Sequence, residues 1–272
     1  MLRKVFFFFC KAGLIGMLLL MVACATVPLT ERKALHLVSN SELAAMSLQQ
    51  YQKVLRESKL STDPATVQMV RSVGTRMARS TEDTLRDRGL ESEIKLYKWE
   101  FNLIEDDKTV NAWCMPGGKV AVYTGLLPVT QSEAGLAVVM GHEIAHAIAN
   151  HGNERVSQGL LQQMGGMALS VALSTNPSAT NQIFMAAYGV GTTVGIMLPY
   201  SRTHESEADR IGLILMARAG YDPREAIPFW QRMNKTGGSR PPELLSTHPA
   251  PETRIKQIEA LLPEALKYYK GY

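Results

Sequence analysis

The sequence predicts a single α+β domain that is mainly helical and contains one small β-sheet. Helix-capping residues and apolar residues at helical spacing recur along most of the chain, whereas strand-like alternation with turn signals is found at about residues 94–124. Apolar residues make up 46% of the chain, which is enough for a buried core. Long helical patterns with few strands are typical of an α+β fold.

The N-terminal residues have the features of a secretory signal. They show a basic start, an apolar run over residues 12–23, and Cys24 directly after it. The tripeptide before Cys24 resembles a bacterial lipobox, although Met21 stands where leucine is usual. This implies cleavage before Cys24 and a lipid on its thiol; the alternatives are a plain signal peptide or an uncleaved anchor.

We therefore expect a signal peptide over residues 1–23, a tether over residues 24–38 and the folded domain over residues 39–272. A lipid on Cys24 makes a membrane the first expected partner. Ala25, rather than aspartate, after the cysteine suggests by analogy the outer membrane of a Gram-negative cell, with the domain on the periplasmic side.

Charge and cysteine content exclude other classes of protein. Residues 1–23 carry three of the 29 basic residues and none of the 25 acidic residues, so the remaining chain is close to neutral at +1. This gives no argument for a nucleic-acid partner. Cys114 is the only cysteine left for the fold, which rules out an intramolecular disulfide, and we expect it to be a buried apolar residue.

Helices are expected where a capping residue precedes an apolar pattern of helical spacing. Their predicted ranges are Ser39 or Ser41 to about 57, Asp63-Pro64 to about 80, Thr130 (capping box with Glu133) to Gly152, about 160–173, about 183–198, about 203–219 before Gly220, a helix capped by Asp222-Pro223 with Glu225, and about Pro251 to Leu262.

Two regions of the chain predict the sheet. Residues 94–104 alternate as a strand, and residues 109–124 are two extended pieces around Pro116-Gly117-Gly118, which form a hairpin or a strand with a sharp turn. The apolar pieces at about 160–173 and 183–198, split by STNPSATNQ, are each shorter than the roughly 20 residues of a membrane span. They are expected to be buried helices.

The sequence His142-Glu143-Ile144-Ala145-His146 is an HExxH motif on a predicted helix. Positions i and i+4 share one face of a helix, so both imidazoles can reach one metal ion. Glu143 is turned by about 100° from His142 and can face a water on that ion without being a ligand. Small and apolar neighbours argue against a surface helix, and buried imidazoles need partners.

A hydrolytic zinc site has three protein ligands and keeps a position for water. The candidates for the third ligand are His151, His204, Glu205, Glu207 and His248. His151 follows His146 by five residues, which rotates it off the ligand face, so we expect it to be a surface polar residue.

The segment THESEADRIG favours Glu205 as the third ligand. On a helical wheel Asp209 lies about 40° from Glu205, small residues flank that side, and Glu207 faces away. Small residues let this helix approach another closely. Asp209, one turn later, is expected to accept a hydrogen bond from the N–H of a ligating histidine.

HExxH followed far downstream by ExxxD resembles the zinc metallopeptidase family of the CAAX prenyl protease and HtpX, in the style of its periplasmic lipoprotein members. The resemblance covers about residues 95–262 and includes NAWCMPGGKVAVYTGLL, SRTHESEADRIG and STHPAPETRI. It implies a mainly helical gluzincin-type zincin fold in which the edge of a small sheet lies beside the zinc. The implied site is one Zn²⁺ per chain, held by His142, His146 and Glu205, with Glu143 as the catalytic base.

The resemblance also implies a substrate-binding edge. In such peptidases an extended edge near the zinc pairs with the substrate backbone by strand addition, which places Asn111 and Ala112 close to the cleavage point. The alternative is an ordinary core hairpin. Trp113 and Met115 depart from the usual family pattern and leave the subsite preference open.

His248 in STHP is similar in position to a histidine that approaches the zinc in some periplasmic relatives. It is either a removable fourth ligand or a donor to the oxyanion, and the alternative is a plain loop histidine. Tyr200 and Arg202 are further candidate donors.

These features predict a zinc-dependent endopeptidase of the bacterial cell envelope, acting on peptides or misfolded proteins in quality control. The alternative is a non-catalytic, chaperone-like lipoprotein that binds unfolded outer-membrane proteins. An intact Glu143 argues against the alternative, because a scaffold has no need of that base. The sequence does not specify the oligomeric state.

Overall fold

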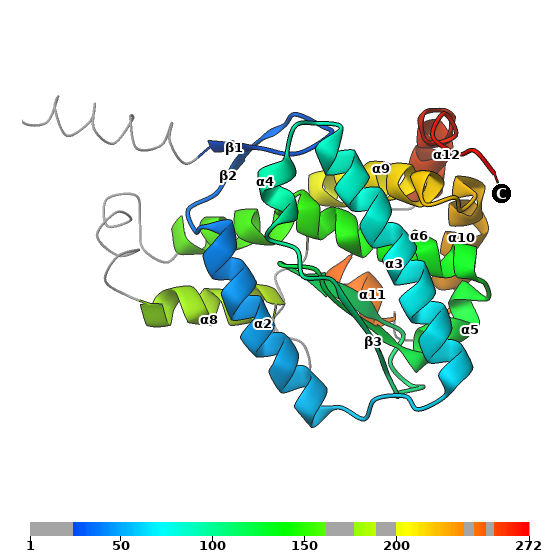
Figure 1. Cartoon of the computed structure of the whole chain (residues 1–272), viewed down its shortest axis with the longest axis horizontal. Coiled ribbons are helices and arrows are strands. Elements are labelled where there is room, and N and C mark those ends of the chain that lie inside the picture. The colour runs from blue at the N-terminus through cyan, green and yellow to red at the C-terminus, as the bar shows by residue number, and fades with distance from the viewer. Residues whose placement is uncertain (1–23, 162–176, 189–199, 237–241, 249–252, 272) are drawn as a thin grey trace, which may run out of the picture.

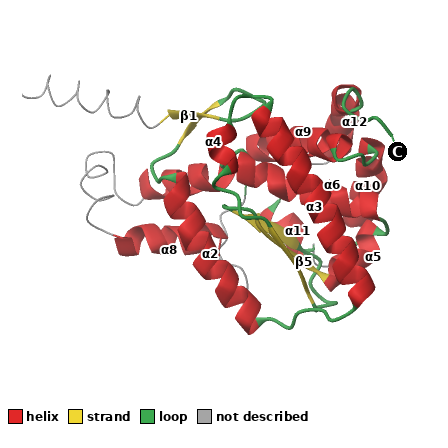
Figure 2. Ribbon diagram, in the orientation of Figure 1, coloured by secondary structure: helices red, strands yellow, loops and turns green. Residues whose placement is uncertain are grey.

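The computed structural model describes residues 24–161, 177–188, 200–236, 242–248 and 253–271 (Figure 1). The predicted signal peptide lies outside these residues. Most of the described chain is helical, with a three-stranded sheet lying among the helices and a separate two-stranded hairpin near the N-terminus (Figure 2), and this confirms the α+β prediction. The helices are α2 (Asn40–Glu57), α3 (Pro64–Arg86), α4 (Glu91–Ile94), α5 (Leu127–Thr130), α6 (Glu133–Ile148), α8 (Pro177–Tyr188), α9 (Arg202–Arg218), α10 (Ala226–Lys235), α11 (Glu243–Thr247) and α12 (Arg254–Ala265), with 3-10 turns η1 (Thr124–Leu126) and η2 (Pro223–Glu225).

Local capping explains where the long helices begin. The Ser39 hydroxyl accepts from the Glu42 amide at 3.2 Å at the start of α2, and Asp63 accepts from the Thr66 amide at 3.2 Å at the start of α3. Both helix starts were predicted. The helix α3 continues to Arg86, beyond the predicted end at about residue 80, and the buried Leu85 extends its core-facing side.

The sheet has the strand order β3 (Glu100–Ile104), β5 (Lys119–Tyr123), β4 (Ala112–Met115), with β3 parallel and β4 antiparallel to β5. The predicted hairpin is therefore confirmed, and its turn uses Gly117 and Gly118 at φ of 83° and 78°. The predicted strand over residues 94–104 is only partly correct, because its first half forms the end of α4 and a turn. The edge strand β4 packs against α6.

The helices α6 and α9 cross at two glycines. A Cβ on Gly212 would lie 2.8 Å from the carbonyl carbon of Gly141, so the two backbones are in contact. This places His142, next to Gly141, against α9. The N-cap of α6 is Ser132, whose hydroxyl accepts from the Gly135 amide at 3.0 Å, and not the predicted capping box at Thr130.

The helix containing HExxH ends earlier than predicted. The helix α6 stops at Ile148, Asn150 takes a left-handed φ of 55°, and a separate helical segment follows over residues 151–161. Asparagine is one of the few residues that adopts this conformation at low cost. A single helix through Gly152 was the wrong expectation, and His151 belongs to the second segment.

Residues 24–38 differ from the predicted tether. They form a hairpin of β1 (Cys24–Thr26) and β2 (Lys33–Leu35), which lies beside α4 in Figure 1. Val27 and Ala34 are buried in the main core. These short strands have too few residues for a periodic pattern, so their docking depends on tertiary contacts.

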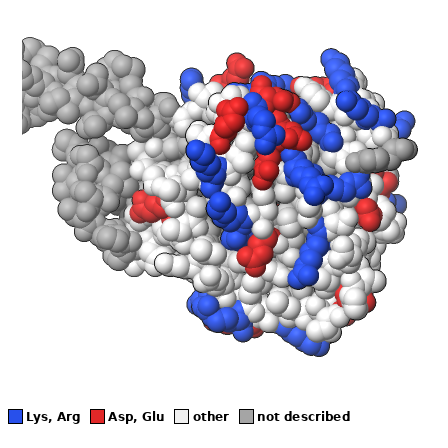
Figure 3. Space-filling model, viewed as in Figure 1, with Lys and Arg blue, Asp and Glu red and all other residues white. Residues whose placement is uncertain are grey.

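The two predicted apolar helices between residues 160 and 198 are only partly covered by the described residues. Most of the apolar pieces at about 160–173 and 183–198 lies outside the described residues, and α8 begins at Pro177, inside the stretch predicted as a break. Among the helices that the structure describes, none combines the length and apolar character of a membrane span. The face in Figure 3 carries basic and acidic side chains interspersed.

Candidate metal centre and active site

Four side chains from three parts of the chain meet in the core. His142 and His146 come from α6, Glu205 from the first turn of α9, and His248 from the end of α11. All four are buried, and one ligand atom from each lies within 4.8 Å of the others. The fold thus brings together the three predicted ligands and the candidate fourth.

The spacing of these atoms fits a tetrahedral zinc site. Zinc bonds of about 2.0–2.2 Å to nitrogen and oxygen require ligand atoms roughly 3.3–3.5 Å apart. The Nε2 atom of His142 lies 3.1 Å from Nε2 of His146 and 3.4 Å from Oε2 of Glu205. Nε2 of His146 lies 3.3 Å from Oε1 of Glu205. Two buried imidazoles that face each other can share only one proton, whereas a cation satisfies both lone pairs.

His248 completes the cluster. Its Nδ1 lies 3.2 Å from Nε2 of His142 and 3.0 Å from Oε1 of Glu205, which is the position of a fourth ligand. Its Nε2 lies 3.5 Å from Oε1 of Glu143. This arrangement is unlike that of a plain loop histidine.

Glu143 is on α6 beside the cluster without belonging to it. Its side chain is buried, and its Oε1 has no hydrogen-bond partner among the described residues. Burial raises the pKa of this carboxyl, although His248 and His142 oppose the shift. Because Oε1 accepts no hydrogen bond from the described residues, it has a lone pair for a water or a substrate N–H.

Asp209 contacts the ring nitrogen of His142 that does not face the metal cluster. Its Oδ1 lies 3.0 Å from Nδ1 of His142, where the carboxylate accepts the ring N–H and leaves Nε2 free for a metal. Burial opposes ionisation, but the Arg254 guanidinium lowers the pKa of Asp209. The contact is the one expected from the helical wheel.

Sequence reasoning missed Arg254. This buried residue at the start of α12 donates to Oδ1 of Asp209 at 2.6 Å and to Oε2 of Glu205 at 3.2 Å. Its guanidinium also stacks 3.6 Å above the ring of Trp230. The only sequence signal was its place in STHPAPETRI, because one arginine in a C-terminal amphipathic helix resembles a surface residue.

His151 corrects another prediction. It was expected to be a surface residue, yet it is fully buried, and its Nδ1 lies 2.9 Å from Nδ1 of His146. The helix break at Asn150 is the reason, because the wheel assumed one continuous helix. The other ring nitrogen, Nε2, lies 3.2 Å from Oε2 of Glu207. Glu207 faces away from the ligand cluster, as predicted, but is also buried.

The sequence profile of Peptidase family M48 matches residues 64–262, which is most of the chain. The chain belongs to peptidase family M48. This confirms the resemblance and the metallopeptidase class predicted from the sequence. Members of this family use zinc, and the His/Glu cluster is able to bind a metal ion, so the predicted cofactor is also confirmed.

Individual relatives come from mitochondria and bacteria. The mitochondrial metalloendopeptidase OMA1 of Schizosaccharomyces pombe is 40% identical over 170 residues, covering 62% of this chain and 48% of the relative. The Bos taurus metalloendopeptidase OMA1 is 31% identical over 275 residues, covering 97% and 51%. The beta-barrel assembly-enhancing protease of Escherichia coli is 31% identical over 215 residues, covering 75% and 41%. The chain therefore spans about half the length of these relatives.

The predicted substrate edge belongs to β4, which packs against the helix α6 that carries His142 and His146. Ala112 begins β4, and Asn111 is buried with its carbonyl accepting from the Tyr123 amide at 3.1 Å. Among the described residues no strand pairs with the outer edge of β4. Cys114 on this strand is a buried free thiol, as predicted. Burial, with a smaller contribution from Glu143, raises its pKa.

The candidate oxyanion donors differ in position. The ring of Tyr200 lies 3.9 Å from that of His146 and 4.9 Å from that of His248, whereas Arg202 is exposed. Burial raises the pKa of Tyr200 to about 12, so its hydroxyl keeps its proton. Tyr200 therefore lies beside the metal cluster, and Arg202 points to solvent.

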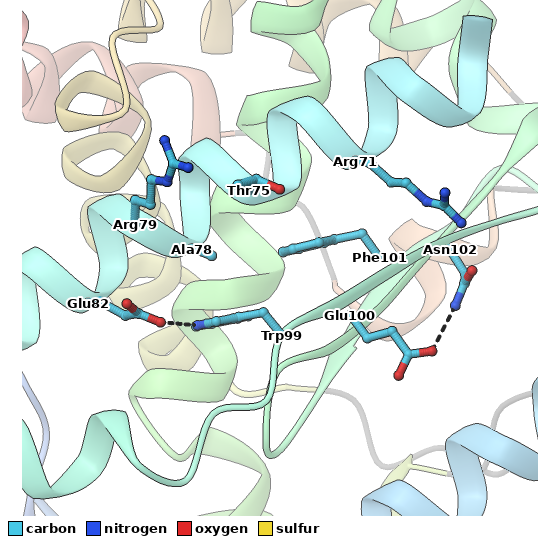
Figure 4. A pocket seen from close by; sticks show the side chains of 9 residues that line it. All are labelled: Arg71, Thr75, Ala78, Arg79, Glu82, Trp99, Glu100, Phe101 and Asn102. Atoms are coloured by element: carbon cyan, nitrogen blue, oxygen red, sulfur yellow. Dashed lines mark hydrogen bonds between the residues drawn. The ribbon is translucent and has the colours of Figure 1, made fainter. Parts of the chain in front are cut away.

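A cavity elsewhere in the molecule does not share this chemistry. It has a volume of about 520 Å³ and lies between α3 and β3. Figure 4 shows its lining, which includes Arg71, Arg79, Trp99 and Phe101. Glu82 in this lining accepts from the Trp99 indole at 3.0 Å. No residue of the metal cluster lines this cavity. The functional site is therefore identified by its converging ligand atoms and not by the size of a cavity.

Proposed function

We propose that this chain is a zinc-dependent endopeptidase of the bacterial cell envelope, with Glu143 as its general base. The observation that carries the proposal is the buried carboxylate of Glu143, which follows His142 directly and whose Oε1 has no hydrogen-bond partner among the described residues and lies 3.5 Å from Nε2 of His248. A carboxylate with a raised pKa beside a metal site is suited to take a proton and to return it.

The residues divide the work of peptide hydrolysis. When bound by His142, His146 and Glu205, zinc supplies a Lewis acid that lowers the pKa of water. Glu143 takes the proton of the attacking water and passes it to the leaving amine. Asp209 keeps the His142 ring in the tautomer that leaves Nε2 free for the metal.

We infer that the substrate binds along the outer edge of β4. An extended peptide added there gains backbone hydrogen bonds without a requirement for particular side chains. The edge belongs to a strand that packs against α6, which carries His142 and Glu143, and this supports the proposal that Asn111 and Ala112 bind the substrate near the scissile bond.

We propose that His248 is a removable fourth ligand. Its Nδ1 lies within 3.2 Å of ligand atoms of His142 and Glu205, where it takes the place that a catalytic site leaves for water. Release of His248 would open that place. The same side chain could then donate to the oxyanion, so the two predicted roles belong to different states.

The proposed location and substrates rest on the N-terminus and on the bacterial relatives. A lipid on Cys24 would anchor the domain at the membrane, and the Escherichia coli relative at 31% identity is named for enhancing β-barrel assembly. We propose that the substrates are misfolded envelope proteins. Mitochondrial relatives show that the family also works outside bacteria.

A catalytically dead variant tests the enzymatic proposal. The full chain would be purified with bound zinc and incubated with an unfolded outer-membrane β-barrel protein. We expect cleavage by the wild type and by Glu259→Gln, an exposed control, and a loss of at least about a hundredfold in Glu143→Gln with zinc retained. Equal cleavage by Glu143→Gln refutes the mechanism.

The same assay addresses the chaperone-like alternative. The unpaired outer edge of β4 suits binding without cleavage. If the wild type with stoichiometric zinc binds the unfolded protein but never cleaves it, the chaperone-like function replaces the enzymatic one. The anchor is tested by a fatty-acid probe in cells, where equal labelling of wild type and Cys24→Ser rejects the lipid.

A further inference from the structure

The N-terminal hairpin, residues 24–35, reaches the back of the metal centre through one arginine. Arg32 donates from Nε to Oε2 of Glu207 at 2.7 Å and from Nη2 to Oε2 of Glu154 at 2.8 Å. Thr30 in the same turn donates to Oε1 of Glu207 at 2.5 Å. Both oxygens of the Glu207 carboxylate are therefore held by a segment more than a hundred residues away in sequence.

Glu207 is in turn connected to a metal ligand. Its Oε2 lies 3.2 Å from Nε2 of His151, and Nδ1 of His151 lies 2.9 Å from Nδ1 of His146. Arg32, Glu207, His151 and His146 thus form a continuous chain of polar contacts. Its last member presents Nε2 to the cluster that binds the ion.

The proton positions along this chain follow from its carboxylate end. An ionised carboxylate only accepts, so Nε2 of His151 donates to Glu207 and Nδ1 of His151 is left as an acceptor. His146 must then donate from Nδ1, and its Nε2 keeps the lone pair that a metal requires. His142 obtains the same tautomer directly from Asp209. The two histidines are therefore oriented by different segments: His142 by Asp209 on α9, and His146 through His151 and Glu207 by the N-terminal hairpin.

The charge balance shows why Arg32 matters to this arrangement. Glu154 and Glu207 are two buried carboxylates that share one guanidinium, and Glu154 also contacts Nε2 of His204 at 3.0 Å. Without Arg32 the two acids lose their shared counter-ion. Glu207 would then lose one of its three side-chain partners, and its carboxylate would be held less firmly as the acceptor for His151.

We propose that Arg32 is a positioning residue for the zinc ligand His146, acting through Glu207 and His151, so that docking of the N-terminal hairpin determines how tightly the site holds zinc. The hairpin begins at Cys24, the proposed lipid site. The metal centre is therefore built in part by the segment that adjoins the proposed anchor.

The test measures zinc affinity and not proteolysis, so its outcome is independent of the proposed peptidase function. The full chain in detergent would be titrated with zinc against a chelator, and the Co²⁺-substituted protein would be examined by absorption spectroscopy. We expect Arg32→Gln and Glu207→Gln to weaken zinc binding about 10- to 100-fold and to alter the Co²⁺ ligand-field bands. Arg32→Lys keeps the charge but lacks the planar guanidinium that contacts both carboxylates, so its zinc affinity should lie between those of Arg32→Gln and the wild type.

Lys33→Gln is the matched control. Lys33 is the next residue of the hairpin, is exposed, and its Nζ bonds only Thr26 of the same hairpin among the contacts described. This variant removes the same charge and should bind zinc like the wild type. Equal zinc affinity in Arg32→Gln and Lys33→Gln would overturn the proposal.

Two further variants separate positioning from general destabilisation. If Arg32 acts through His151, the double variant Arg32→Gln/His151→Gln should lose little more affinity than His151→Gln alone, and fully additive losses overturn the proposal. Thr30→Val removes only the hydrogen bond from the Thr30 hydroxyl to Glu207, and it tests the same chain of contacts if Arg32→Gln does not fold. It should weaken zinc binding roughly two- to tenfold, and an unchanged affinity counts against the chain of contacts.

Discussion

Gly141 and Gly212 bring the backbones of α6 and α9 into contact, and this contact sets the distance between the two helices that carry the ligands. A Cβ on Gly212 would lie 2.8 Å from the carbonyl carbon of Gly141 and 2.9 Å from the amide nitrogen of His142. The neighbouring atoms are backbone and cannot swing away.

Gly212→Ala should therefore push the helices apart. We expect a loss of stability of about 1–3 kcal/mol together with weaker zinc binding, because Glu205 moves with α9. Urea unfolding and zinc titration measure the two effects. Ser206→Ala, an exposed change on the same helix, should alter neither, and a Gly212→Ala protein as stable as this control would contradict the packing argument.

Arg254 is expected to be essential for the fold of the site. Removing it leaves Glu205 and Asp209 as buried carboxylates without their common cation, which costs about 3–5 kcal/mol for a broken buried pair. Denaturant unfolding of Arg254→Gln checks this, with the exposed Lys256→Gln as the matched control. A difference below about 1 kcal/mol between the two variants would show that the buried network contributes little.

His248→Ala should raise proteolysis if His248 is a removable fourth ligand. The change vacates the position near His142 and Glu205 where water is needed, while the other three ligands remain. Initial rates of peptide cleavage at saturating zinc measure the effect. Unchanged or lost activity would exclude the role of His248 as a removable fourth ligand and leave only its role as a donor to the oxyanion.

Glu154 should make the stability of the protein sensitive to acid. Burial opposes its ionisation, but bonds to His204 and Arg32 lower its pKa from 4.5 to about 2. A depressed folded-state pKa contributes stability that is present above pH 4.5 and is lost as the pH falls from 4.5 towards 2. Urea midpoints of the zinc-free protein at pH 5 and pH 3 should therefore differ more in wild type than in Glu154→Gln. An identical pH dependence of the two proteins would show that His204 and Arg32 do not lower the pKa of Glu154.

Local sequence signals were sufficient for much of this protein. Ser39 and Asp63 locate two helix starts because capping involves residues only three apart. His142, Glu143 and His146 share one helix, so their geometry follows from helical spacing alone. Glu205 and Asp209 were also selected in this way, since the candidate ligand and the residue that contacts His142 lie one turn apart on α9.

Other features depended on contacts that no local pattern contains. Asn150 breaks the helix, and this single backbone conformation turns His151 from a predicted surface residue into the buried neighbour of His146. The hairpin carrying Arg32 has no periodicity of its own, because its position depends on carboxylates contributed by distant helices.

The sequence by itself determined the family, the α+β class, the HExxH helix and the third candidate ligand, because each rests on spacing within one element or on a family pattern. Only the tertiary structure decided what surrounds the ligands. Arg254 from the C-terminal helix and Arg32 from the N-terminal hairpin support opposite sides of the same cluster. Their roles arise from buried charges that must be paired, and the partners of a buried charge are chosen by the fold.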